Sequence, residues 1–293
     1  MTRLRTVLVI VAASVAAFML LRGWHRTAPP PPAKLRIVSL APSVTEILFA
    51  LGLGDNITGV TEQCNYPPAA HKIERVSGFG TPNAEKLLAL GPDLVIACGL
   101  EKPELAEILS RAGIQVVNVQ KRGFIASFPE LFDVVGQIGR ATGRSAEAKR
   151  LVGGMQAQLD AVAARVGRID EAQRPRVFVE IGESPLMTAG AGSFIDDLIR
   201  KAGGRNVAAE ISSAYPRIDP EKVIAWDPEV ILVAHNDRPG EAAERLAQRI
   251  GWSGITAVRT RRVIDDIDAD LLFRPGPRLV DGVKVLAARL HPK

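Results

Sequence analysis

Two acidic residues stand out because the sequence around them is repeated. The segment NAEKLLALGPDLVIA at residues 83–97 aligns without a gap on DPEKVIAWDPEVILV at residues 219–233. Each copy predicts an N-cap residue, a helix of two turns, a proline that ends the helix and a buried strand. Glu85 and Glu221 therefore occupy the same position, the second of the helix, in two related units.

A carboxylate at this position can have one of two roles. In the first turn of a helix, the helix dipole stabilises a negative charge by about 0.3–1 kcal/mol, and no partner is needed. Two matching carboxylates on two matching units would instead suit a partner with two-fold symmetry. Because the pattern occurs twice, we expect Glu85 and Glu221 to form a docking pair.

The usual signatures of catalysis and of bound ions are missing from the sequence. It has no G-x-S-x-G elbow, HExxH or CxxC, and Gly190 and Gly192 lack the spacing of a nucleotide fingerprint. Its four histidines are scattered, so a clustered site for a bare zinc or manganese ion is not expected. His235 follows a predicted strand, but a lone histidine is more often a loop residue than a metal ligand. We expect a binding protein with no catalytic residues, no protein-bound metal and no cofactor of its own.

Strands and helices alternate on both sides of the repeat. The first block has predicted strands at residues 36–40, 57–62, 94–98 and 115–119, and helices at residues 43–51, 84–90 and 103–111. The second block has predicted strands at residues 176–182, 230–234 and 262–264, and helices at residues 193–201, 220–226, 241–250 and 278–290. Apolar strands rich in β-branched residues, separated by amphipathic helices, predict parallel sheets covered on both faces. The predicted fold class is therefore α/β, with two Rossmann-like lobes.

A long helical region separates the two blocks. Ser127 and Glu130 form a capping box that begins one helix, and a second helix is predicted for residues 145–169. At about 1.5 Å per residue, the second helix is long enough to cross a small domain and to join the lobes rigidly. We divide the chain into an N-terminal segment, a first lobe, connecting helices and a second lobe, at residues 1–33, 34–125, 126–170 and 171–293.

The first 36 residues differ in charge from the rest of the chain. They contain six of the 37 Lys and Arg residues and no Asp or Glu, which leaves 31 basic against 32 acidic residues elsewhere. The lobes are thus nearly neutral, and no nucleic-acid partner is expected. Two arginines precede an uncharged apolar run from Thr6 to Leu21, which is typical of an export segment, and four prolines at residues 29–32 predict a stiff spacer. Residues 1–33 are therefore expected to be a membrane anchor or signal with a Pro-rich spacer.

Two segments of the first block resemble a known family. RIVSLAPSVTEILFALGLGDNITGVTEQCNYPP and VSGFGTPNAEKLLALGPDLVIA are similar to the first lobe of class III periplasmic solute-binding proteins of ABC importers, most closely the cobalamin (vitamin B12)-binding ones. The resemblance covers roughly residues 35–293. It implies capture of cobalamin or a related corrinoid in a cleft between the lobes, at the carboxyl ends of the strands. It also implies that Glu85 and Glu221 meet arginines of the permease dimer.

The resemblance suggests which residues contact the ligand. Phe79 and Tyr215 match positions at which the cobalamin binders place tryptophans against the corrin, and an aromatic face can pack flat on a macrocycle. Asp270 and Arg274 align with polar residues on the loop above the cleft of the second lobe, where they could bond to ligand amides. A solvated loop would contain the same residue types.

Two residues of the first lobe leave the identity of the ligand undecided. Gln63 stands where the cobalamin binders have a tyrosine. Tyr66, in NYPP, fits the family and is either a buried turn residue or, as in haem-binding relatives, a metal ligand. The expected ligand is a cobalt or iron complex, with haem or a ferric siderophore as the alternative to a corrinoid. A tethered sensor or scaffold that does not transport anything is the alternative of another class.

The same reasoning predicts the compartment. We expect a periplasmic monomer that is anchored to the inner membrane by an uncleaved helix within residues 1–33, with secretion after signal cleavage as the alternative. An oxidising compartment would let Cys64 and Cys98 pair, so we expect two small buried residues or one disulfide. Two thiols do not have the spacing of a metal finger.

Overall fold

The computed structural model describes residues 34–292, apart from residues 79–80, 100–102, 121–123 and 236–238. The chain separates into a short N-terminal unit, Met1–Leu35, and one compact unit, Arg36–Lys293. The predicted anchor and spacer lie outside the described residues, as does Phe79. Within the described part, no helix is both long enough and apolar enough to span a bilayer.

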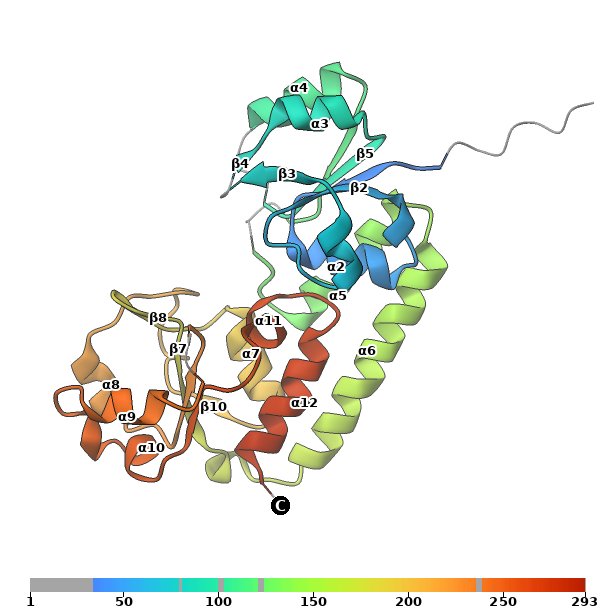
Figure 1. Ribbon diagram of the computed structural model, residues 1–293. Helices are drawn as coiled ribbons and strands as arrows, with labels where there is room; N and C mark the ends of the chain where they lie inside the picture. Colours follow the sequence, from blue (N-terminus) through green and yellow to red (C-terminus); the bar gives the residue numbers. More distant parts are fainter. Residues whose placement is uncertain (1–33, 79–80, 100–102, 121–123, 236–238, 293) are drawn as a thin grey trace, which may run out of the picture. The chain divides into compact units, whose positions relative to one another are not determined.

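The first lobe is built on a six-stranded sheet with the order β4-β3-β2-β1-β5-β6, in which only β3 and β4 are antiparallel. The strands are β1 (Ile37–Ser39), β2 (Ile57–Thr61), β3 (Arg75–Gly78), β4 (Thr81–Pro82), β5 (Leu94–Ala97) and β6 (Gln115–Asn118). The helices are α2 (Pro42–Ala50), α3 (Ala84–Leu90) and α4 (Pro103–Arg111), with short 3-10 turns at Gly54–Asn56 and Pro68–Lys72 (Figure 1). The predicted elements of this lobe are confirmed with small shifts at their ends, whereas β3 and β4 were not predicted.

The second lobe contains a smaller, all-parallel sheet with the order β10-β7-β11-β12. Its strands are β7 (Arg176–Glu180), β10 (Arg205–Asn206), β11 (Val230–Val233) and β12 (Val263–Ile264), and a separate hairpin pairs β8 (Gly182–Glu183) with β9 (Leu186–Met187). The helices are α7 (Phe194–Lys201), α8 (Pro220–Trp226), α9 (Ala242–Ala247), α10 (Thr256–Arg259) and α11 (Ala269–Phe273), with 3-10 turns at Glu171–Gln173 and Trp252–Gly254. The predicted strands of this lobe are confirmed, although β7 ends two residues earlier, at Glu180 instead of residue 182.

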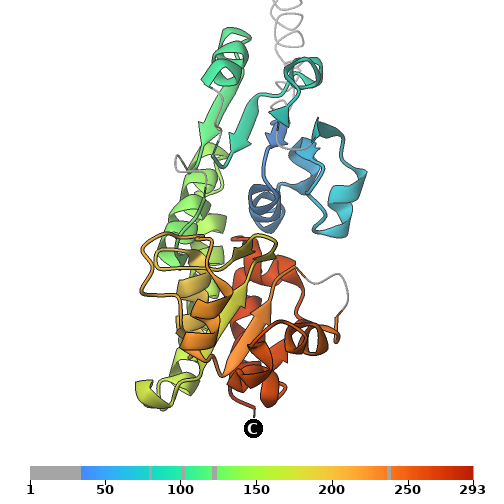
Figure 2. The same ribbon diagram turned by 90° about the vertical axis from the view of Figure 1, so that its left-hand side faces the viewer.

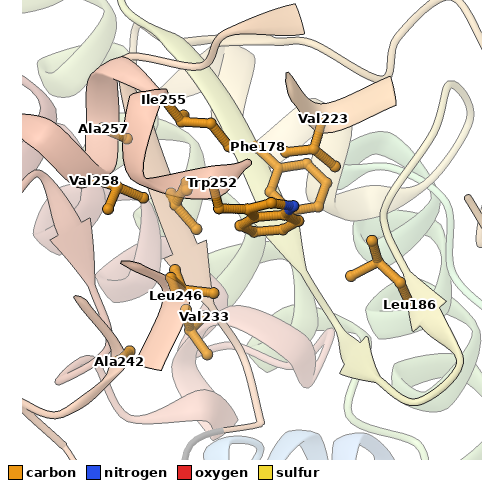
Figure 3. Packing of buried hydrophobic residues seen from close by; sticks show 11 residues of the cluster. Phe178, Leu186, Val223, Val233, Ala242, Leu246, Trp252, Ile255, Ala257 and Val258 are labelled. Carbon is orange, nitrogen blue, oxygen red and sulfur yellow. The ribbon is translucent and has the colours of Figure 1, made fainter. Parts of the chain in front are cut away.

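Large apolar side chains fill the interior of the second lobe. Phe178 of β7 and Trp252 lie at the centre, with their ring centroids 6.2 Å apart, and Val223 of α8 and Leu186 of the hairpin close the cluster (Figure 3). Trp226 of α8 is partly buried and packs against this cluster. Burial of such side chains stabilises the fold by roughly 1.5–3 kcal/mol each.

The connecting helices are α5 (Phe128–Ala141) and α6 (Ser145–Val166). Ser127 accepts a hydrogen bond from the backbone N–H of Glu130 (3.3 Å), so the predicted N-cap is present, and α6 ends three residues before the predicted residue 169. The helix α6 packs along α5 and along the closing helix α12 (Leu279–Leu290), and both contacts can be followed in Figures 1 and 2. A continuous helix thus runs between the two lobes.

The internal repeat is also visible in the hydrogen bonds. At the start of β1, the backbone N–H of Arg36 donates to Asp93 (2.8 Å), and at the start of β7 that of Arg176 donates to Glu229 (2.9 Å). Each of the two guanidinium groups also donates to a carbonyl at the end of the repeat helix of its own lobe. The letters of the repeat therefore encode the same local structure twice.

Candidate ligand cleft and docking helices

A cavity of about 460 Å³ lies beside the start of α2 and the carboxyl ends of β7 and β11. Both lobes contribute to its wall, which is formed by Pro42, Ser43, Ile181, Ala234, Ala269, Asp270, Phe273, Arg274 and Pro275. Loops at the carboxyl ends of parallel strands are where such sheets bind ligands. Most of the wall is apolar, and the charged groups come from α11 and the residue that follows it.

The two charged residues of this wall are tied to the first lobe. Arg274 forms an ion pair with Asp270 (2.8 Å) and donates to the side-chain oxygen of Asn65 (2.5 Å). Asn65 in turn donates to Asp270 (3.0 Å), which closes a triangle of polar contacts. The loop that carries Asn65 is held in place by Arg75, which donates to two of its backbone carbonyls. The structure thus places Asp270 and Arg274 at the cleft, with fixed orientations.

Glu46 is the centre of this polar cluster, and the sequence analysis missed it. Glu46 lies on α2 and is only 4% exposed. Two guanidinium nitrogens of Arg278 donate to its two carboxylate oxygens, at 2.7 and 3.0 Å. Arg274 approaches the same carboxylate at 3.4 Å. The hydrogen bonds that Arg278 donates to Glu46 are the main cause of the raised pKa of Arg278. The available signal was a lone acid in an otherwise apolar helix, PSVTEILFA.

Tyr66 and Gln63 lie at the edge of the same cluster. The ring of Tyr66 is stacked under the guanidinium of Arg278, 3.7 Å from the ring centroid, while the residue is 40% exposed. The prediction that Tyr66 is a buried turn residue is therefore wrong, because its ring covers a cation at the surface. Gln63 contributes its backbone carbonyl, which accepts from Arg274 at 3.4 Å, and its side chain is exposed.

Tyr215 is not among the residues that line this cavity. Its ring makes an edge-to-face contact with Phe124, with centroids 6.1 Å apart and an interplanar angle of 77°. Burial raises the pKa of the Tyr215 phenol to about 12. Of the predicted ligand-binding residues, four gather around the Glu46 cluster, Tyr215 does not, and Phe79 lies outside the described residues.

The sequence analysis also missed a second buried acid, Glu180, which is the last residue of β7. Glu180 is completely buried and accepts from Arg249 (2.9 Å) and from the ring nitrogen Nε2 of His235 (2.8 Å). Arg249 also pairs with Glu183 at 2.9 Å, and this contact lowers the pKa of Glu183. His235 is thus fixed by a carboxylate at the carboxyl end of β11.

Glu85 and Glu221 are both exposed in the first turns of α3 and α8. Asn83 caps α3 by accepting from the backbone N–H of Lys86 (3.0 Å), whereas Asp219 makes no side-chain cap. Within the residues described, neither glutamate forms an ion pair with a Lys, Arg or His. Their equivalent placement in two helices agrees with the alignment from which they were predicted.

The two cysteines are not joined. Cys64 is buried with its sulfur 3.1 Å from the hydroxyl groups of Thr45 and Thr61, and Cys98 is partly buried, which raises the pKa of its thiol. Of the two expectations for this pair, small buried residues apply instead of a disulfide. Within the described part of the chain, no three His, Cys, Asp or Glu side chains come together to hold a metal.

Comparison with known proteins identifies the group to which this architecture belongs. The family model described as periplasmic binding protein matches residues 37–269. The chain belongs to the periplasmic binding protein family. Members of this family bind solutes, and the family does not correspond to a class of enzymes.

Individual relatives match over nearly the whole chain. YvrC of Bacillus subtilis, an uncharacterized ABC transporter substrate-binding lipoprotein, is 34% identical over 88% of this chain and 80% of its own length. The crystal structure of BtuF, the periplasmic vitamin B12 binding protein of Vibrio cholerae, has a TM-score of 0.72 and 30% identity, covering 87% of this chain and 96% of that one. The periplasmic heme-binding protein RhuT from Roseiflexus sp. RS-1, in its apo form, has a TM-score of 0.75 and 28% identity, covering 88% and 98%. The two-lobed α/β fold and the resemblance to class III binding proteins are thereby confirmed.

Proposed function

We propose that this protein is the substrate-binding component of an ABC importer and that it captures cobalamin or a related corrinoid in the cleft between its lobes. The observation that carries the proposal is the balanced charge at the cleft, where Glu46 and Asp270 are paired with Arg274 and Arg278. The name of YvrC, an ABC transporter substrate-binding lipoprotein, supports the importer role, and that of BtuF, a vitamin B12 binding protein, supports the corrinoid.

The balanced charge bears on the choice of ligand. A corrin ring is surrounded by neutral amide side chains, whereas haem carries two carboxylates. A carboxylate that competed for the bonded nitrogens of Arg274 would displace Asp270 or Asn65, which would leave a poorly solvated charge unpaired. Amides both donate and accept, so they can bond to Asp270 and Arg274 while the ion pairs stay in place. The cluster therefore favours a neutral, amide-bearing ligand.

Aromatic contacts complete the proposed site. Tyr66 offers a partly exposed ring beside the cluster, and we assign it, with Gln63, to the first-lobe side of the ligand. Tyr215 and Phe79 are assigned to the site on the family resemblance alone. A ring face that packs on a macrocycle contributes through area and stacking, by about 1 kcal/mol or more.

The test is a comparison of two ligands on the same full-length protein in detergent. Calorimetry and absorption spectroscopy with cyanocobalamin and with haemin should show one cyanocobalamin bound per chain and weaker binding of haemin. Tight haemin binding without any response to cyanocobalamin would overturn the corrinoid assignment while leaving a binding protein of the same family.

Haem is the second candidate, for a specific reason. Tyr66 is 40% exposed beside the Glu46 cluster, phenolate oxygen is a known axial ligand of haem iron, and the heme-binding RhuT has a similar fold. An iron–phenolate absorption band that disappears in Tyr66→Phe would favour haem.

We further propose that the protein works in the periplasm as a monomer, held at the inner membrane by residues 1–33, and that Glu85 and Glu221 contact arginines of a permease dimer. Cell fractionation and intact mass measurement would distinguish an uncleaved anchor from a cleaved signal. Charge reversal at both glutamates should abolish uptake and leave ligand affinity unchanged. If this double variant transports normally, a tethered sensor or scaffold becomes the better description.

A further inference from the structure

An exposed apolar side chain follows each docking glutamate at the same distance in the sequence. Leu88 on α3 is 40% exposed, and Ile224 on α8 is 37% exposed. The alignment of the repeat pairs these two residues, as it pairs Glu85 with Glu221. Single exposed apolar residues are common on protein surfaces. Two at equivalent positions of a repeated helix call for a shared explanation.

The apolar residue and the glutamate lie on one side of each helix. Glu85 and Leu88 are three residues apart, as are Glu221 and Ile224, and side chains with this spacing are neighbours on a helix surface. The intervening Leu87 is fully buried, as is its counterpart Val223. The side of each helix that faces the core is therefore not the side that carries the glutamate and the exposed apolar residue. We call each exposed pair, Glu85 with Leu88 and Glu221 with Ile224, a carboxylate–apolar pair.

The lysines beside these glutamates are engaged elsewhere. Lys86 donates to the backbone carbonyl of Arg75 (3.2 Å) and lies 3.9 Å from Glu74. Lys222 pairs with Glu210 at 3.3 Å and lies over the ring of Trp226, 5.1 Å from its centroid. Each lysine therefore neutralises groups of its own lobe. Both glutamates keep their charge available for a partner.

We propose that each carboxylate–apolar pair is a composite docking contact, in which the permease supplies a cation for the glutamate and an apolar surface for the neighbouring Leu88 or Ile224. This inference rests on the proposed function, because it takes the permease dimer as the partner. The symmetry of the two pairs then requires the cation and the apolar surface to occur once in each permease subunit.

The two parts of the contact have different physical roles. Exposed charges are screened by salt, with a Debye length of about 8 Å at physiological ionic strength, and they mainly raise the association rate. Removal of apolar surface from water does not depend on charge, and it mainly slows dissociation. The glutamates therefore steer the protein onto the permease, and Leu88 and Ile224 prolong its stay.

The experiment measures binding of the full-length protein to its own permease–ATPase complex in lipid nanodiscs, at low and at high salt. The double variant Leu88→Ser/Ile224→Ser should bind about tenfold more weakly at both salt concentrations, through faster dissociation. Glu85→Lys/Glu221→Lys should lose association rate, and most strongly at low salt. Val285→Ser, a matched control on α12 with 36% exposure, should bind like the unchanged protein.

The outcomes separate this inference from the proposed function. If the glutamate variant loses binding but Leu88→Ser/Ile224→Ser keeps the dissociation rate of the unchanged protein, the composite contact is wrong and importer docking stands. If neither double variant changes binding, or the unchanged protein does not bind the permease at all, both proposals fall. Thermal unfolding and ligand affinity of each variant, expected to be unchanged, show that a loss of docking is not a loss of folding.

Discussion

In the part of the chain that the structure describes, each lobe buries one glutamate, and both are held by the same kind of contact. Glu46 in the first lobe is 4% exposed and Glu180 in the second is fully buried, and each is bound through two nitrogens of one arginine, Arg278 or Arg249. Each guanidinium also stacks on an aromatic ring, at 3.7 Å and 4.6 Å from its centroid. The local chemistry of the two clusters is nearly identical.

Their places in the chain differ, and so should their roles. The partners of Glu180 all belong to the second lobe, so this cluster stabilises the lobe itself. The arginines that bind Glu46 follow it by 228 and 232 residues and belong to the other lobe. The same ion-pair chemistry therefore serves stability in one place and the joining of two lobes at a ligand cleft in the other.

The largest effect is expected for Glu180→Gln. This change removes the fully buried carboxylate charge that balances Arg249, so the free energy of unfolding should fall by about 3 kcal/mol. Urea unfolding followed by circular dichroism measures it. Glu183→Gln is the matched control, because Glu183 pairs with the same arginine at the surface and should cost less than about 1 kcal/mol. Equal losses in the two variants would contradict the distinction.

A smaller and more local effect is expected for Glu46→Gln. Asp270 still pairs with Arg274 in this variant, and a small separation of the two lobes lets water reach the arginines, so the free energy of unfolding should fall by about 1–2 kcal/mol. Hydrogen exchange should accelerate around α2 and α11, while the core of the second lobe stays protected.

The same variant tests whether the lobes move. In the unchanged protein, α6 and the Glu46 cluster both restrain the lobes, so small-angle scattering should show nearly the same radius of gyration with and without ligand. A ligand-dependent contraction that appears only in Glu46→Gln would assign this restraint to the cluster. A large contraction in the unchanged protein would show that neither element holds the lobes.

Changing the charge balance should shift ligand preference by a modest amount. Asp270→Asn leaves one positive charge at the cleft uncompensated, so the affinity for haemin should rise severalfold relative to cyanocobalamin. Asp266→Asn, a control at an ion pair with Arg289 that is about half exposed, should leave the ratio unchanged. An unchanged ratio would mean that Asp270 does not face the ligand.

The last effect appears only at alkaline pH and concerns the partly buried phenol of Tyr215. Burial raises the pKa of Tyr215 from 10.0 to about 12, so its contribution to stability is complete below pH 10 and is lost as the pH rises toward 12. The protein has two tyrosines, so in Tyr66→Phe the ultraviolet absorbance of phenolate reports Tyr215 alone. A titration midpoint near 10 would mean that the phenol is not buried.

Much of the fold could be predicted because its signals are local. Alternating apolar strands and amphipathic helices predicted the α/β class and the two lobes, and Ser127 marked the start of α5. The strands β3, β4 and β10 were not predicted, because they are short and lack a run of β-branched residues, and β4 and β10 also lie at the edges of their sheets. Pairing with a neighbouring strand, instead of intrinsic preference, makes such segments strands.

The candidate site divides in the same way. The sequence by itself determined the equivalence of Glu85 and Glu221, because a repeat can be recognised from letters alone. The tertiary structure decided that Arg278 binds Glu46, that Tyr66 covers this arginine, and that Glu180 fixes His235. These contacts join residues tens to hundreds of positions apart. The energy of an ion pair in a low-dielectric site depends strongly on the distance between the two charged groups. No local pattern encodes such distances, which arise only when both lobes are folded.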